Sequence, residues 1–170
     1  RRPWIRLTEL PQGARIGTNA SRRQGQLLHL RPDLEIIPIR GNVDTRLKKL
    51  SALDLDAIAL AEAGLDRLGS ALDEFSRLSL ADILIPAPGQ GAIAVECRID
   101  AADSLALLKA IDDPLTHRAV AIEREFLATL GGSCRFPFGG YARQSNHRWY
   151  FDGMVATHDG TQYYHRHVQS

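Results

Sequence analysis

Short apolar runs alternate with helix-forming segments over the first part of the chain, and this order limits the fold more than any other feature. The expected strands are residues 14–18, 34–39 and 56–61, and the expected helices are residues 21–30 and 42–50. Strands separated by helices favour a parallel sheet, because each helix returns the chain to the end at which the previous strand began. Pro38, near the end of the second strand, predicts an edge position or a strand terminus. We therefore predict that residues 1–100 form an α/β domain with a parallel-type sheet.

The rest of the chain, residues 101–170, has the pattern of a small α+β domain. A polar stretch at residues 98–103 marks the expected boundary, and residues 92–97 are expected to form a strand just before it. A short helix is expected at residues 104–111. A longer one from Pro114 has a buried stripe of Leu115, Ala119, Ile122, Phe126 and Leu130. Strands at residues 148–156 and 162–168 are joined by a turn that contains Asp159-Gly160. The pattern predicts a helix pair on an antiparallel sheet.

Five arginines follow the carboxyl ends of the expected parallel strands. They are Arg22, Arg23, Arg40, Arg46 and Arg67. Ligands of parallel α/β sheets bind at these ends, so the arginines are expected to face one site, with Asn19 or Ser21 as the N-cap of the first helix. A guanidinium group makes two parallel hydrogen bonds to a carboxylate, and the chain has no P-loop. A substrate with several carboxylates is therefore favoured over a nucleotide, and solvated surface arginines are the alternative interpretation.

Charge and cysteine content argue against several classes of function. The net charge of +1, from 21 basic and 20 acidic residues, gives no global field that would favour nucleic acid or membrane. No apolar run approaches the roughly 18 to 20 residues of a membrane helix. Cys97 and Cys134 lack the spacing of a zinc site or a disulfide framework, and the histidines form no metal-binding pattern. We expect a cytoplasmic protein without a metal site.

The two cysteines differ in their surroundings. Cys97 ends an apolar run, as structural cysteines often do, whereas Cys134 lies in a glycine-flanked loop after a helix. For Cys134 an attachment or nucleophilic role and a structural role are equally open on these grounds.

Several segments resemble the hydroxymethylbilane synthase family, which is also called porphobilinogen deaminase. Two of them are specific: Arg40-Gly41-Asn42-Val43-Asp44-Thr45-Arg46-Leu47 and Ala63-Gly64-Leu65-Asp66-Arg67-Leu68-Gly69. Further similar segments, in the same order as in the family, are residues 16–24, 31–34, 86–92 and 132–137. The sequence departs from the family at Asn19-Ala20-Ser21, where a hydroxyl is missing at Ala20, and at Ser133, which stands for a glycine.

The resemblance implies a transferase of tetrapyrrole and haem biosynthesis that condenses four porphobilinogen units into hydroxymethylbilane with release of ammonia. It implies a dipyrromethane cofactor bound by a thioether to Cys134. Acetate and propionate groups of cofactor, substrate and growing polypyrrole chain would contact Arg22, Arg23, Arg40, Arg46 and Arg67, with Thr18 and Gln90 near the cofactor. A first domain similar to a periplasmic-binding-protein lobe and a monomeric state are also expected.

The family's catalytic aspartate lies in a His-Ser-x-Lys-Asp-x-Pro stretch that nothing in this sequence matches. No catalytic residue is therefore assigned, and Asp44 is not promoted to that role. The chain also begins without methionine and ends within the expected last domain. We expect a fragment whose amino-terminal segment is a separate partner, and which alone binds carboxylates poorly and does not turn over porphobilinogen. The alternative is a non-catalytic carboxylate-binding module of the same fold.

Overall fold

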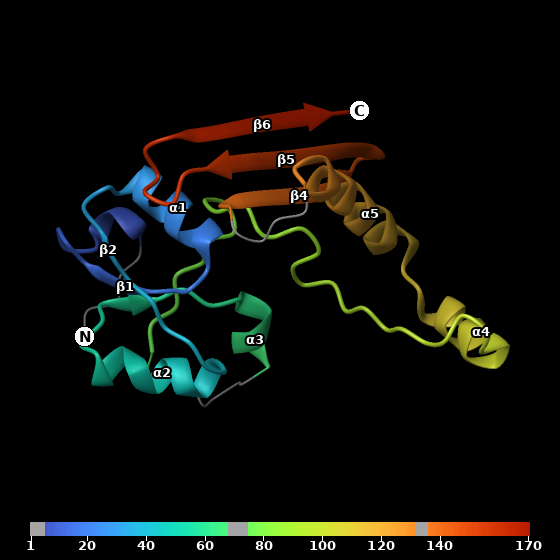
Figure 1. Cartoon of the computed structure of the whole chain (residues 1–170), viewed down its shortest axis with the longest axis horizontal. Helices are drawn as coiled ribbons and strands as arrows, with labels where there is room; N and C mark the ends of the chain where they lie inside the picture. Colours follow the sequence, from blue (N-terminus) through green and yellow to red (C-terminus); the bar gives the residue numbers. More distant parts are fainter. Residues whose placement is uncertain (1–5, 68–74, 132–135) are drawn as a thin grey trace.

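The computed structural model describes residues 6–67, 75–131 and 136–170 (Figure 1). Its helices are η1 (Leu7–Glu9, a 3-10 helix), α1 (Ser21–Leu30), α2 (Val43–Ala52), α3 (Glu62–Asp66), α4 (Ala102–Ile111) and α5 (Pro114–Thr129). Its strands are β1 (Arg15–Gly17), β2 (Glu35–Ile37), β3 (Ala57–Ile58), β4 (Phe138–Ser145), β5 (Arg148–Ala156) and β6 (Tyr163–Gln169). These strands form two separate sheets.

The first sheet is parallel, as the alternation of strands and helices predicts. Its strand order is β2-β1-β3, and Ile16 in β1 pairs with Ile36 on one side and Ala57 on the other. β2, which precedes Pro38, lies at an edge of this sheet as expected. Buried side chains of η1, β1, α1 and the loops that adjoin them form the core beside it: Leu7, Leu10, Ala14, Ile16, Leu27 and Leu34.

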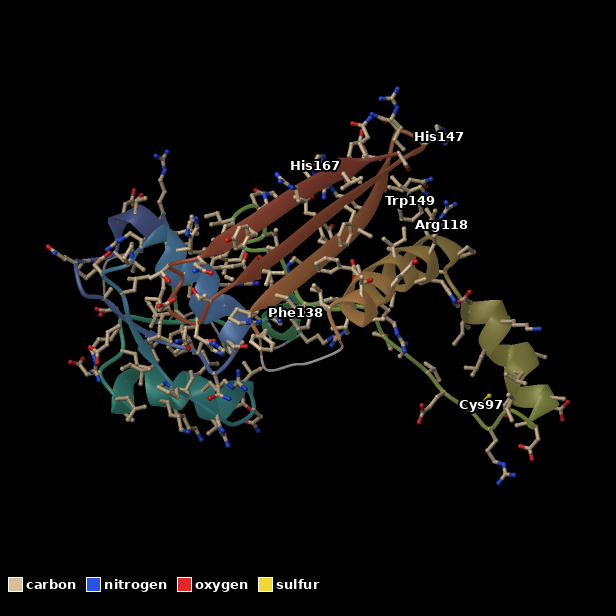
Figure 2. The ribbon with its side chains drawn as sticks, turned by 45° about the horizontal axis from the view of Figure 1, so that its top comes forward. Cys97, Arg118, Phe138, His147, Trp149 and His167 are labelled. Atoms are coloured by element: carbon tan, nitrogen blue, oxygen red, sulfur yellow. The ribbon has the colours of Figure 1, made fainter. Side chains whose placement is uncertain are left out.

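The second sheet is antiparallel, with the order β4-β5-β6. The β5–β6 turn contains Asp159 and Gly160, which has φ +69°. α5 packs on one face, where Phe126 meets Phe151 edge-on at 5.1 Å between ring centroids. Figure 2 shows Arg118 of α5 beside Trp149, and its guanidinium carbon lies 5.0 Å from the ring centroid.

α1 joins the two sheets. A Cβ on Gly25 would lie 2.7 Å from the carbonyl oxygen of Thr157, so only glycine permits this close approach of the helix. One turn later, His29 stacks on Tyr163 of β6 with 4.3 Å between ring centroids. Figure 1 shows α1 lying against the ends of β5 and β6. The same helix therefore packs on both halves of the molecule.

Some sequence expectations are wrong, and each fails where tertiary contacts decide the outcome. Residues 92–97 form no strand but an extended segment, in which Ile93 is 78% exposed. α4 lies apart from both sheets, so the expected helix pair is reduced to α5 (Figure 1). Leu115 and Leu130, two members of the expected buried stripe, are exposed. None of the described helices is long and apolar enough to cross a membrane.

A carboxylate ties the three strands of the second sheet together. Asp152 of β5 accepts a hydrogen bond from Arg143 of β4. One of its carboxylate oxygens also lies 3.0 Å from a ring nitrogen of His165 and 2.8 Å from one of His167, both in β6. Burial alone would raise the pKa of Asp152, but hydrogen bonds from Arg143, His167 and His165 outweigh it and lower this pKa from 3.8 to about 2.

Asp152 should therefore stabilise the fold in a defined pH range. A carboxyl group with a lowered pKa contributes stability that is complete above about pH 4 and is lost as the pH falls through about 2. We expect Asp152→Asn to reduce the free energy of unfolding by about 2 kcal/mol at pH 6, and by much less at pH 2. Urea unfolding at both values measures this, with the exposed Glu96→Gln as control. An equal loss at both pH values would contradict the assignment.

Candidate functional site

The junction between β1 and α1 builds the centre of the candidate site. At the end of β1, a Cβ on Gly17 would lie 2.8 to 2.9 Å from side-chain atoms of Ile39, Leu55 and Ile58, so glycine lets the three strand ends close together. Thr18 is buried, and its hydroxyl accepts from the amide of Ala20 at 3.3 Å. This threonine hydroxyl therefore fixes the backbone at the start of the helix.

The N-cap of α1 is Ala20, without a side-chain hydrogen bond, so the expectation of Asn19 or Ser21 in that role is wrong. Ser21 is already the first helical residue. The consequence is a helix start whose backbone N–H groups are not capped by a side chain of the N-cap residue.

Arg22 and Arg23, in the first turn of α1, are both partly buried beside neutral oxygens. Arg22 donates to the Gln90 side-chain oxygen at 2.9 Å, and Arg23 donates to the Ala59 carbonyl at 2.9 Å. Burial, followed by the nearby charge of Arg23, lowers the pKa of Arg22 to about 10. Burial and then the charge of Arg46 lower the pKa of Arg23. We call Arg22, Arg23 and Arg46 the cation cluster.

Arg46 reaches this cluster from the start of α2. Asn42 is the N-cap and accepts from the amide and the hydroxyl of Thr45 at 2.9 and 2.7 Å. Gly41 has φ +124°, and its carbonyl accepts from Arg46 Nε at 2.7 Å. The Gly-Asn turn thus sets the direction of the Arg46 side chain.

The other two predicted arginines are not brought into the cluster. Arg40 and Arg67 are both exposed, Arg40 before the Gly41 turn and Arg67 at the end of α3. The carbonyl of Arg40 accepts from Lys49 at 2.9 Å. Among the described residues, charge interactions thus link three of the five arginines, which are Arg22, Arg23 and Arg46.

Two cavities adjoin the first turn of α1. The larger, of about 1230 Å³, has Arg22, Arg23 and Gln90 in its lining and also reaches Arg143 and His165 of the second sheet. The smaller, of about 260 Å³, lies between residues 19–22 and the start of β4, where Figure 2 labels Phe138. Phe136 also lines the smaller cavity, and it follows Cys134 by two positions. Cys134 itself lies outside the described residues.

Two buried polar residues that sequence reasoning missed support this region. Gln26 is 1% exposed and Glu123 is 5% exposed, and both bind backbone groups close to the cavity. A glutamate within the apolar stripe of α5 was the available signal for Glu123. Gln26 carries no comparable signal.

The arrangement is suited to binding anions. Partly buried guanidinium groups beside one another raise the free energy of the empty site, and a carboxylate would relieve that repulsion while accepting charge-assisted hydrogen bonds. Within the described ranges, no group of three or more His, Cys, Asp or Glu side chains is placed to hold a metal ion.

Comparison with known proteins identifies similar sequences along nearly the whole chain. Residues 2–106 match the family model "Porphobilinogen deaminase, dipyromethane cofactor binding domain", and residues 117–169 match "Porphobilinogen deaminase, C-terminal domain".

Curated relatives carry the name porphobilinogen deaminase. The chain is 52% identical over 154 residues to that of Limosilactobacillus reuteri, covering 91% of this chain and 50% of the relative. It is 49% identical over 158 residues to that of Nitrobacter winogradskyi, covering 93% and 50%. It is 48% identical over 164 residues to that of Sphingopyxis alaskensis, covering 96% and 51%. The chain spans about half the length of the curated relatives it matches.

Gly17 offers a test of how the site is built. We expect Gly17→Ala to destabilise the chain by about 1 to 3 kcal/mol, because the added methyl group overpacks the junction. The matched control is Gly64→Ala in α3, where the nearest atom to the new Cβ lies 3.8 Å away. This control should gain about 0.5 to 1 kcal/mol of stability. Chemical denaturation measures both, and equal effects of the two substitutions would contradict the geometry at Gly17.

Proposed function

Because the chain belongs to the porphobilinogen deaminase family, we propose that it is the cofactor-carrying and carboxylate-binding part of a hydroxymethylbilane synthase. The complete enzyme condenses four porphobilinogen units, each of which loses its amino group as ammonia. The single observation that supports this assignment best is the cation cluster at the first turn of α1. Each pyrrole unit carries an acetate and a propionate, and such a substrate supplies the anions that clustered arginines require.

The chain's own residues suit a dipyrromethane group. Arg22 and Arg23 would hold its carboxylates, since both are half-buried and neither has an anionic partner among the described residues. Attachment through the sulfur of Cys134 would form one carbon–sulfur bond, with the porphobilinogen amine leaving as ammonia. When bound, the cofactor supplies the pyrrole end from which the product chain grows. Arg40 and Arg67 would contact carboxylates of the longer chain, for which their exposure leaves them available.

Several finer assignments accompany this proposal. The division into domains at residues 1–100 and 101–170 is supported by the change from a parallel to an antiparallel sheet. The exposed apolar side chains at Ile93, Val95 and Ile99 are supporting signs that this segment completes the fold of a separate amino-terminal partner. A periplasmic-binding-protein-like first lobe, a cytoplasmic location, a monomeric state and inactivity of the isolated chain stay predictions.

If the cation cluster binds carboxylates, substitution of Arg23 should reduce the affinity of the chain for porphobilinogen. We expect Arg23→Gln to weaken porphobilinogen binding by about tenfold, because a charge-assisted hydrogen bond contributes about 1.5 kcal/mol or more. Arg98→Gln is the control, since Arg98 is exposed and paired with Asp100. Isothermal titration calorimetry on the full 170-residue chain provides the comparison. Equal affinity of both variants would argue against the cluster as the binding site.

Cofactor attachment predicts a modified cysteine. When the amino-terminal half of a relative is supplied together with porphobilinogen, we expect an Ehrlich-reactive mass adduct on this chain that Cys134→Ala abolishes and Cys97→Ala leaves in place. Intact mass spectrometry with peptide mapping locates the adduct. An adduct on Cys97 instead would contradict the proposed role of Cys134. A chain that binds porphobilinogen but never carries an adduct would favour a non-catalytic carboxylate-binding module.

A further inference from the structure

A short segment that we call the strap, residues 85–90, runs between α1 and the edge strand β4. Gly139 and Gly140 of β4 make room for it: a Cβ on Gly139 would lie 2.8 Å from the Ile85 carbonyl oxygen and 2.9 Å from that of Pro86. The amide of Gly140 donates to the Pro86 carbonyl at 3.0 Å. The strap ends at Gln90, whose side chain holds the guanidinium of Arg22.

Gln26 fixes the beginning of the strap. Its side-chain amide donates to the Ile85 carbonyl at 2.9 Å and accepts from the Ile85 amide at 2.8 Å, as a neighbouring strand would. The same nitrogen lies 3.3 Å from the carbonyl oxygen of Arg22, one helical turn earlier. Gln26 is buried, so the loss of either contact would leave its buried partner groups without a hydrogen bond to protein or to water. One side chain therefore connects the strap directly to the backbone of Arg22.

Glu123 fixes the end of the strap. One carboxylate oxygen accepts from the amide of Gly89 at 2.5 Å, and the other accepts from the amide of Ala142 in β4 at 2.8 Å. Gly89 has φ +73°, a left-handed conformation that glycine adopts without strain, and it directly precedes Gln90. Glu123 thus sets the turn from which the Gln90 side chain departs.

From these contacts we infer that Glu123 and Gln26 are positioning residues, which hold the strap so that Gln90 fixes the Arg22 guanidinium at the cavity. Neither residue lines the cavity. Both act on the Arg22 side chain through the strap and Gln90, and Gln26 also contacts the Arg22 carbonyl. Gln90 is exposed, so water competes for its hydrogen bond to Arg22, and this bond depends on a turn that is held from the buried side. The importance of this for carboxylate binding rests on the proposed function, but the positioning itself does not.

The test measures the reactivity of Arg22 in the purified 170-residue chain without ligand. Phenylglyoxal modifies accessible arginines, and peptide mass spectrometry gives the rate at each site. In Glu123→Gln, the new NH₂ group meets a backbone N–H, so one end of the strap is released. We expect Arg22 to react about fivefold faster, the factor that corresponds to loss of a hydrogen bond of about 1 kcal/mol. Arg31, which is held by Asp33 and by the carbonyls of Leu7 and Leu10, is the internal control.

A second background separates positioning from general destabilisation. In Gln90→Ala, Arg22 has already lost its partner, so adding Glu123→Gln should leave the Arg22 rate unchanged. Gln26→Glu, which cannot donate to the Ile85 carbonyl when ionised, should reproduce the faster rate of Glu123→Gln. If Glu123→Gln does not fold, Glu123→Asp retains the charge but is too short to reach both amides, and the same expectation applies to it.

A fall in melting temperature with an unchanged Arg22 rate would overturn the inference and leave Glu123 a purely structural residue. The inference would also be overturned if Glu123→Gln accelerated Arg22 modification as much in the Gln90→Ala background as in the chain that retains Gln90. Because no ligand is present, these outcomes are independent of whether porphobilinogen binds. Failure of porphobilinogen binding with an accelerated Arg22 would count against the proposed function alone.

Discussion

Repulsion between partly buried guanidinium groups is the constraint on which the rest of the site depends. Arg22 and Arg23 are adjacent in the first turn of α1, and Arg46 is close enough to lower the pKa of Arg23. Folding brings them together beside the neutral oxygens of Gln90 and Ala59, which accept hydrogen bonds but carry no compensating charge. Charge repulsion among these arginines lowers the stability of the free protein, and a bound anion would reduce that repulsion. The cluster therefore costs folding stability but favours binding of an anion.

Several contacts fix the backbone around the cation cluster. Gly17 and Thr18 fix the backbone between β1 and α1. Asn42 caps α2, from which Arg46 extends. Gly25 and His29 pack the other side of α1 against the second sheet. A guanidinium group binds a carboxylate well only when its planar fork is already oriented, because ordering it on binding costs side-chain entropy. Gln26 and Glu123, which hold the strap from the buried side, orient the guanidinium of Arg22 before a carboxylate binds.

Sequence reasoning recovers the local part of this picture and misses the long-range part. β1, α1 and α2 follow from apolar periodicity, and the Gly-Asn turn follows from short-range chemistry that a single segment contains. Gln26 and Glu123 could not be found in this way, because their partners lie 59 and 34 positions away. Residues 92–97 have the composition of a strand, but a strand needs a partner, and composition does not say where that partner is. For Arg40 and Arg67, the sequence predicts a backbone position after a strand or turn. It does not predict where the guanidinium at the end of a long side chain lies.

The role of the cation cluster is tested most directly by an NMR titration of the arginine-labelled chain with porphobilinogen, in which each guanidinium Nε–H group reports separately. The account predicts saturable shifts concentrated at Arg22, Arg23 and Arg46, with Arg98 and Arg166 unchanged. Shifts confined to exposed arginines, or spread evenly over all of them, would contradict a carboxylate site at the first turn of α1.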